Sequence, residues 1–507
     1  MFFFRTALLL LLGGLLALTV RAQPVVEQMA VRTLYESWQL PGGEAMGVVA
    51  LGARQRLGEH ASLGVDFFDA VRGNRGGFIT LGMSGALDYP LGGRWAVESD
   101  LFIGAGSGNG GYELAGGGLM LRGSAGLRYG LTEKDALSIG LSGVAFPAGG
   151  TIHSAQLYAG YSRSFKVLMQ SGQHVFGQTP WTDMDWTGYA PSRHAAGMLV
   201  GSIRVPAAAT RIGGGVQQDL RMMGVEWQTF SDDSPVFLRF ETAGAMGGSS
   251  VGYMHILAGA GVELPLYESL VAEAALNVGG GGGGGVRTGG GLLTAATLGL
   301  RVDLMDGWFM KASGGRIRAV QGELAGDDFT LVLGRHFAGA KRGEFREQQP
   351  VLLISHPLRL RVAQQTYTGL APDWRSRPDR EVANLGAAID YFIDPRWFVS
   401  GQGMAAYAGE AGAFMTGLVG AGYRLPLADR LFIQGEMLTG AAGGGGINVG
   451  SGLVQQFNLS LGYRWTDSLS LMLTAGEARA LNGPFRARVW GLALGYDFNL
   501  FTPGGAR

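Results

Sequence analysis

Acidic and basic side chains recur at matched positions along segments whose polarity alternates. They are Glu98, Asp100, Arg122, Arg128, Glu273, Arg301, Asp303, Glu436 and Arg464. Neighbouring antiparallel strands would bring such acids and bases across from each other. One interpretation is an interior passage with a transverse electric field that orients solutes. The other is a set of ion pairs that fills the interior of a narrow barrel.

Catalytic chemistry is not indicated. The chain has seven His and no Cys, which excludes a Cys nucleophile, a Cys-based zinc site and an iron–sulfur cluster. His153 and Ser154 are adjacent, so on a strand they point to opposite faces. No Ser/His/Asp set stands at a recognisable spacing, and the Gly-rich runs lack the Gly-Lys-Ser or Gly-Lys-Thr of a phosphate-binding loop. We therefore expect no enzyme, no cofactor and no metal site.

The elements that carry these charges have the two-residue period of β-strands. In the segment from Leu292 to Leu304, Leu298 and Leu300 fall on an apolar face, and Arg301 and Asp303 fall on the opposite face. The segments Leu453–Trp465 and Leu119–Leu131 show the same alternation. These runs are longer than the usual strand of a soluble protein and suit a tilted membrane crossing.

The N-terminus and the composition indicate export. Residues 1–22 read as a signal peptide, with Arg5 before an apolar run from Ala7 to Val20 and cleavage after Ala22. The run is too short for a transmembrane helix. The 507 residues carry 40 basic and 40 acidic side chains, and this zero net charge gives no reason to expect a nucleic-acid partner.

Tight polar turns alternate with Gly-rich loops, such as Gly279–Gly291 and Gly440–Gly452. Four tryptophans lie beside the tight turns, as in an interfacial aromatic belt: Trp95, Trp308, Trp397 and Trp465. The last amphipathic segment ends in Phe501, six residues before the C-terminus. With these features the chain resembles bacterial outer-membrane β-barrels of porin-like type. The resemblance implies the cell outer membrane as location, and membrane lipid and the barrel-assembly machinery as partners.

A threefold internal repeat divides the chain. Each unit contains an x-Pro-Leu turn, at Tyr89-Pro90-Leu91, Leu264-Pro265-Leu266 and Leu425-Pro426-Leu427. Within a mature chain of residues 23–507, the units span about 23–166, 167–340 and 341–501. Each has about eight strands, so we expect a transmembrane antiparallel β-barrel protein of about 24 strands (about 22–26). The strands form either one large barrel or three small barrels in tandem.

Four functions follow from these patterns. The leading prediction is a porin-like channel for small polar solutes or for export of a specific substrate. The first alternative is a structural scaffold barrel with a filled lumen and no transport. Less favoured are an exported soluble Gly-rich adhesin and a barrel-type lipid hydrolase. Closure discriminates between the first two, because one wide ring leaves an aqueous channel and three small rings make transport improbable.

Overall fold

The computed structural model describes residues 25–109, 111–181, 189–230, 234–342, 351–376 and 381–504. The predicted signal peptide lies outside the described residues. No helix within these ranges has the length and apolar character needed to cross a membrane.

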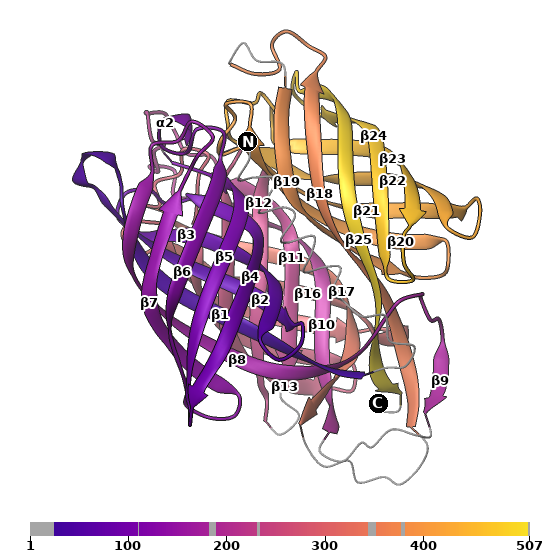
Figure 1. Cartoon of the computed structure of the whole chain (residues 1–507). Coiled ribbons are helices and arrows are strands. Elements are labelled where there is room, and N and C mark those ends of the chain that lie inside the picture. Colours follow the sequence, from indigo (N-terminus) through magenta and orange to yellow (C-terminus); the bar gives the residue numbers. More distant parts are fainter. Residues whose placement is uncertain are drawn as a thin grey trace.

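The described chain contains 25 β-strands, paired antiparallel, which confirms the prediction of about 24. They are arranged in three barrels (Figure 1). Barrel 1 consists of β1 (Val25–Gln39), β2 (Ala45–Arg56), β3 (Ala61–Arg72), β4 (Ile79–Gly92), β5 (Trp95–Ser107), β6 (Leu119–Gly130), β7 (Asp135–Ala145) and β8 (His153–Ser171). Barrel 2 consists of β10 (Tyr189–Arg204), β11 (Leu220–Phe230), β12 (Val236–Gly247), β13 (Met254–Tyr267), β14 (Leu270–Gly282), β15 (Leu292–Asp303), β16 (Trp308–Ala319) and β17 (Ala325–Arg342).

Barrel 3 consists of β18 (Val351–Gly369), β19 (Glu381–Phe392), β20 (Trp397–Ala408), β21 (Met415–Pro426), β22 (Leu431–Gly443), β23 (Leu453–Arg464), β24 (Leu469–Ala480) and β25 (Arg486–Gly504). The short strand β9 (Gln178–Trp181) follows barrel 1. Three short helical segments lie in connections: η1 (Pro41–Gly43), α2 (Gly111–Ala115) and η2 (Met305–Gly307).

Each barrel closes on itself. In barrel 1, the first strand pairs with the last, as in Thr33 opposite Tyr161. Barrel 2 closes between β10 and β17, and barrel 3 closes between β18 and β25. The fold is therefore a triple β-barrel. Of the two predicted architectures, the structure has the three small barrels.

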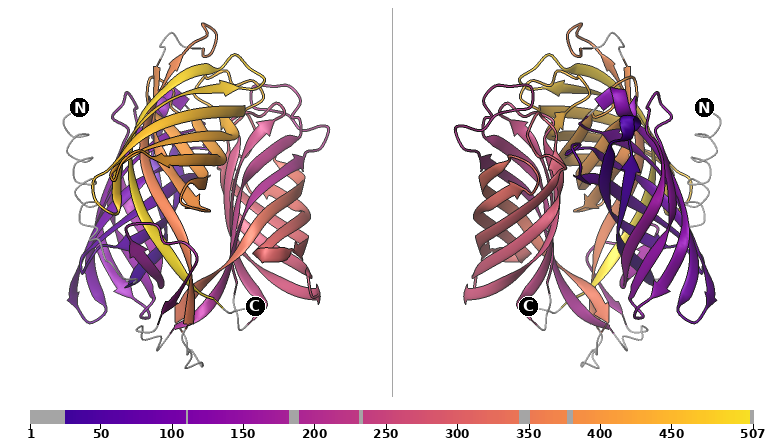
Figure 2. Two further views of the ribbon diagram at one scale, coloured as in Figure 1. Left: turned by 90° about the vertical axis from the view of Figure 1, so that its right-hand side faces the viewer. Right: turned by 90° about the vertical axis from the view of Figure 1, so that its left-hand side faces the viewer.

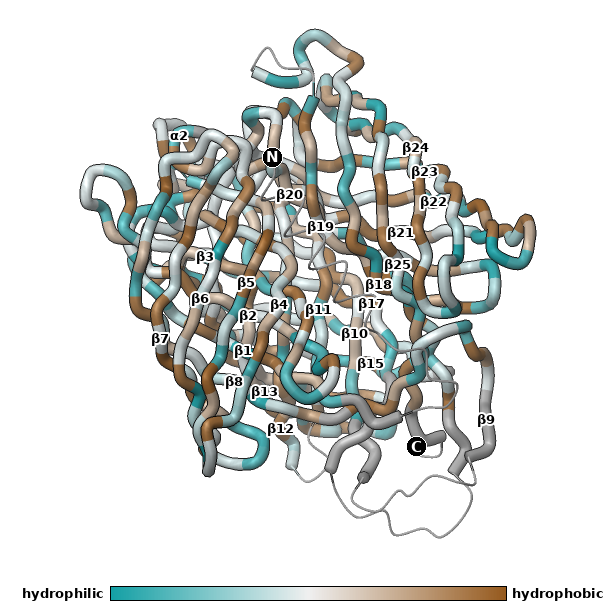
Figure 3. Tube along the Cα trace, in the orientation of Figure 1, coloured by the Kyte–Doolittle hydropathy of each residue, from teal (hydrophilic) through white to brown (hydrophobic). Residues whose placement is uncertain are grey.

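The predicted alternation of faces is confirmed. On β15, the outward Leu298 is 70% exposed, whereas the inward Arg301 is fully buried. Figure 3 shows hydrophobic residues concentrated along the strands and hydrophilic residues at many of the turns. Because the interior of an eight-stranded barrel is just wide enough for side chains to fill it, we expect the inward polar residues to pair with one another.

The barrels pack side by side in all three pairings. Strand β3 contacts β14 and β15, strand β5 contacts β19 and β20, and strand β22 contacts β11 and β12. The barrels converge near the Gly-rich loops and spread apart toward the tight turns (Figure 2).

Glycine permits close backbone approach at each interface between barrels. A Cβ atom on Gly77 would overlap the backbone of Gly282, a Cβ atom on Gly118 would overlap Ala406, and a Cβ atom on Gly443 would overlap Gly252. The Gly-rich segments are thus packed parts of the contacts between barrels.

A continuous sheet also joins barrel 1 to barrel 3. The end of β8 pairs with β25, as in Met169 opposite Leu500. Strand β9 then pairs with the beginning of β18. The connection that leaves barrel 1 therefore crosses the tight-turn end of barrel 3 before the chain enters barrel 2.

Candidate functional site

The interior of barrel 1 is filled by a buried charge network. The Arg122 guanidinium contacts Glu36 Oε2 at 3.1 Å through Nη2 and Asp100 Oδ1 at 3.0 Å through Nη1, and all three side chains are almost completely buried. Arg32 pairs with Asp66 at 2.6 Å. The network lies on the inward faces of β1, β3, β5 and β6, and it leaves these charges compensated inside the lumen.

Barrel 2 has a second network. Arg301 Nη1 lies 2.5 Å from Glu273 Oε1, and Arg301 Nε lies 2.9 Å from Asp303 Oδ1. Lys311 joins Glu273, at 3.3 Å, to Glu226. These contacts connect β11, β14, β15 and β16 across the lumen, so Glu226, Glu273 and Asp303 each face a cation.

Barrel 3 has a third network, formed by adjacent inward positions of β18. Arg361 Nη2 lies 2.5 Å from Glu436 Oε1 and 2.7 Å from Asp390 Oδ1. Arg359 Nη2 lies 2.8 Å from Asp390 Oδ2 and donates a 2.6 Å hydrogen bond to Gln434. The charged layer therefore spans the barrel from β18 to β19 and β22.

Aromatic side chains fill further parts of the lumens. In barrel 1, the buried Trp38 ring packs against Phe68, Phe78 and Phe146, with centroid distances of 6.1 to 6.4 Å. In barrel 3, a cluster near the Gly-rich loops contains Tyr367, Trp374, Phe414 and Phe485. Within the described residues, the ion pairs and these clusters leave the barrel interiors packed with side chains.

The connection after barrel 1 closes the tight-turn end of barrel 3. His174 Nε2 lies 3.0 Å from Asp497 Oδ1, and its ring centroid lies 4.1 Å from that of Phe392. The backbone N–H of Val175 donates a 2.8 Å hydrogen bond to Asn499. Both Asp497 and Asn499 are buried on the inward face of β25, so His174 acts as a cap at this mouth.

The charged residues that the sequence predicts for the lumen fall into two groups, those that form ion pairs and those that do not. Six of them belong to buried or partly buried ion pairs: Asp100, Arg122, Glu273, Arg301, Asp303 and Glu436. The other three, Glu98, Arg128 and Arg464, are half-buried, and none forms an ion pair in the described part of the chain. Arg128 and Arg464 stand at positions that the sequence matches to Arg301, but in the described chain only Arg301 forms ion pairs.

Several partners were missed by the sequence analysis. They are Arg32, Glu36, Arg54, Asp66, Glu226, Arg239, Glu241, Lys311, Arg359, Arg361 and Asp390. The alternation of polar and apolar residues could have identified them as inward-facing, because each lies two residues from another inward position. Only the closed ring shows which of them face each other.

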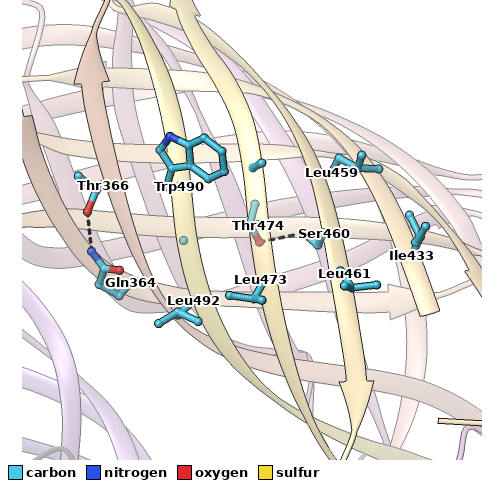
Figure 4. Close-up of a pocket in the computed structure, with 12 residues that line it drawn as sticks. Gln364, Thr366, Ile433, Leu459, Ser460, Leu461, Leu473, Thr474, Trp490 and Leu492 are labelled. Atoms are coloured by element: carbon cyan, nitrogen blue, oxygen red, sulfur yellow. Dashed lines mark hydrogen bonds between the residues drawn. The ribbon is translucent and has the colours of Figure 1, made fainter. Parts of the chain in front are cut away.

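The outward faces are apolar and end in aromatic residues. All four tryptophans that the sequence places beside tight turns are exposed. A groove of about 640 Å³ runs over the outside of barrel 3 between Trp490, Leu473 and Leu459 (Figure 4). The polar side chains at its edge bond to each other, as in the 2.9 Å hydrogen bond from Gln364 to Thr366. This groove offers contact to apolar chains and contains no arrangement for catalysis.

In the described ranges, no group of three or more His, Asp or Glu side chains could hold a metal ion. Ser154 accepts a 2.9 Å hydrogen bond from the backbone N–H of Gln39 and donates one of 2.6 Å to Gln156. The hydroxyl therefore takes part in the polar packing of barrel 1.

No family model matches the chain, and no curated protein matches it in sequence. Among solved structures, it is similar to the siderophore receptor PirA from Acinetobacter baumannii, at 9% identity over 94% of this chain and 81% of that chain, with a TM-score of 0.28. A mutant of the ferric enterobactin receptor PfeA from Pseudomonas aeruginosa matches at 12% identity over 94% and 81%, with a TM-score of 0.27. The ferric-catecholate receptor Fiu from E. coli K12 matches at 11% identity over 94% and 82%, with a TM-score of 0.27. At such low TM-scores, the likeness carries no inference about what this chain does.

Proposed function

We propose that the protein is a structural outer-membrane protein in which three packed barrels present their loops and turns at the cell envelope without conducting solutes. The observation that carries this proposal is the contrast between the two faces of each barrel. The outward face is a band of exposed aliphatic side chains, whereas the inward face is packed with ion pairs such as Arg122 with Glu36. This favours the scaffold alternative over the channel.

The membrane position rests on the outward band and the tryptophans. Leu298 and Leu276 are both more than two-thirds exposed. Such a band would be costly in water and is stabilised by lipid hydrocarbon. Trp95 and Trp308 would lie at the membrane surface. Under this proposal, the barrels contact outer-membrane lipid, and the barrel-assembly machinery inserts them.

Single-cysteine labelling tests the membrane position, because the chain has no native Cys. In isolated outer membranes, we expect Leu298→Cys to resist a water-soluble maleimide and to react once detergent removes the lipid. Glu59→Cys, at an exposed tight turn of barrel 1, is the matched control and reacts in both conditions. Equal labelling of the two variants in intact membranes would contradict a membrane position.

Planar-bilayer recording tests the filled lumen. The purified full chain should give no stepwise conductance at any voltage, whereas a general porin in the same bilayer gives steady channels. Reproducible conductance steps from the wild-type chain would overturn the scaffold proposal and favour the porin-like alternative. The labelling tests only the membrane position, and the recording tests only the absence of conductance. One of these claims can therefore be refuted while the other stands.

A further inference from the structure

One strand of each barrel faces the middle of the molecule. In barrel 1, β4 pairs with β3, which contacts barrel 2, and with β5, which contacts barrel 3. In the same way, β13 and β21 each lie between the strands of their own barrel that contact the other two barrels. These three strands carry the x-Pro-Leu motif at their tight-turn ends, with Pro90, Pro265 and Pro426. The three repeat units therefore turn the same strand toward a common centre.

The outward side chains on these strands change from buried to exposed along the strand. On β4, Leu81 near the Gly-rich end is 7% exposed, whereas Tyr89 near the tight turn is 65% exposed. On β13, the exposed fraction rises from 2% at Ile256 to 63% at Leu264. Because the barrels spread apart toward the tight turns (Figure 2), the faces that touch at the Gly-rich end continue as uncovered apolar surface. A central space, bordered by β4, β13 and β21, is therefore closed at one end and open at the other.

Barrel 3 presents a glycine strip to this space, formed by Gly401 and Gly403 on β20 and Gly417 on β21. At each of these positions, a Cβ atom would meet no atom within 4 Å. Gly403 and Gly417 are paired across the two strands, so the strip is continuous. The next outward residue of β20, Ala405, is fully buried in an apolar cluster with Leu81 of barrel 1. The glycine strip therefore begins where the contact between barrels 1 and 3 ends.

The central space suits a hydrocarbon chain. The structure describes every residue of β4, β13 and β21, and the charged residues of these strands all lie at inward positions: Asp88, Glu263 and Arg424. None of the charged groups of these strands therefore faces the central space. Glycine within a strand often marks a close approach of a ligand to the backbone, since the missing side chain leaves room. An acyl chain needs this room and apolar contact, and it forms no hydrogen bond.

The open end of the central space lies at the tight turns, which face the periplasm in bacterial outer-membrane barrels. At the other end, the backbone contact of Gly443 with Gly252 leaves no room even for a Cβ atom. We propose that the acyl chains of a phospholipid from the periplasmic leaflet occupy the central space and lie against the glycine strip. This proposal rests on the proposed membrane position. It adds a lipid bound between the barrels to the lipid that surrounds them.

Native mass spectrometry of the full chain in detergent tests this proposal. The probe is dioleoylphosphatidylglycerol, and lipid A in a separate sample represents the outer leaflet. We expect the wild type to retain the phospholipid and not lipid A. Gly417→Phe should lose the phospholipid, because the ring would fill the glycine strip. Gly143→Phe is the matched control on β7, at an exposed outward position where a Cβ atom also meets no atom within 4 Å, and it should retain the phospholipid as the wild type does.

Gly403→Leu fills the same strip, should show the same loss, and replaces Gly417→Phe if that variant does not fold. No retained phospholipid on the wild type, or equal retention by the wild type and the folded filling variant, would overturn the central lipid. Retention of lipid A in place of the phospholipid would overturn the periplasmic source. If Leu298→Cys is protected from the maleimide but no phospholipid is retained, only the central lipid is refuted. If that protection is absent, the membrane position fails, and the central lipid fails with it.

Discussion

His174 Nε2 lies 3.0 Å from Asp497 Oδ1, although the two residues belong to different parts of the chain. His174 lies in the connection that leaves barrel 1, and Asp497 lies on the last strand of barrel 3. The contact closes the mouth of barrel 3 and ties the first unit to the third. Barrels 1 and 3 are thus held together by a direct side-chain contact, although barrel 2 lies between them in the sequence.

Removal of this cap should loosen the connection. His174→Ala removes the imidazole that faces the buried Asp497 carboxylate, which costs about 1–3 kcal/mol. We expect faster hydrogen exchange at the Val175 amide, which donates to Asn499 in the intact cap. His60→Ala, at an exposed turn of barrel 1, is the control. Unchanged exchange at Val175 would show that His174 does not hold the cap.

Breaking a lumen network should destabilise its barrel. Arg122→Ala leaves Glu36 and Asp100 buried and short of a cation, and we expect a loss of about 3–5 kcal/mol in the free energy of unfolding. Arg128→Ala, on the same strand, removes no ion pair and should cost less than about 1 kcal/mol. Denaturant unfolding measures both, and equal losses would contradict the network.

Glycine at an interface between barrels should not tolerate a side chain. Gly443→Ala would force a Cβ atom into the backbone of Gly252, so we expect a cost of about 1–3 kcal/mol and weaker packing of barrels 2 and 3. Gly435→Ala, on the same strand, meets no atom within 4 Å and is the control. Unfolding midpoints and limited proteolysis measure the difference. Identical behaviour of the two variants would refute close packing at this interface.

The turn at Asp394 should respond to acid. The backbone N–H groups of Trp397 and Arg396 donate to its carboxylate and lower the pKa of Asp394 below its ordinary value. A lowered folded-state pKa means that the stabilisation is present above the unfolded-state pKa and is lost as the pH falls through the folded-state pKa. We expect Asp394→Ala to lower the Tm at neutral pH, and the difference from wild type to disappear in strong acid. A Tm difference that does not depend on pH would contradict this role.

The strands and their faces were predictable from the sequence, because alternation is a local property. The predicted segment Leu453–Trp465 contains β23 (Leu453–Arg464), and the even-numbered residues of β23 point inward as the pattern predicts. Closure was not predictable, because alternation does not say which strands are partners. Nothing near Thr33 indicates that Tyr161 is its partner.

The charges on the inner face were predictable as a class, but their pairing was not. Arg301 reaches Glu273 on the neighbouring strand as expected. In barrel 1 the acid Asp100 meets Arg122 and Arg32, and Arg128 meets none of the described acids. Side-chain length and the stagger of the strands decide these contacts across a closed ring, and no short stretch of sequence contains that information.

Separate closure of the three barrels is the central claim, and a disulfide tests it most directly. Met198 and Leu333 are outward-facing partners on the first and last strands of barrel 2, and paired residues of this kind are close enough for an S–S bond. In the otherwise Cys-free chain, Met198→Cys with Leu333→Cys should cross-link on oxidation in the folded protein, as seen by mass spectrometry of the digested chain. Met198→Cys with Leu157→Cys, on β8, should remain reduced. A cross-link in the second pair and none in the first would mean that the strands form one large ring, which would contradict the triple barrel.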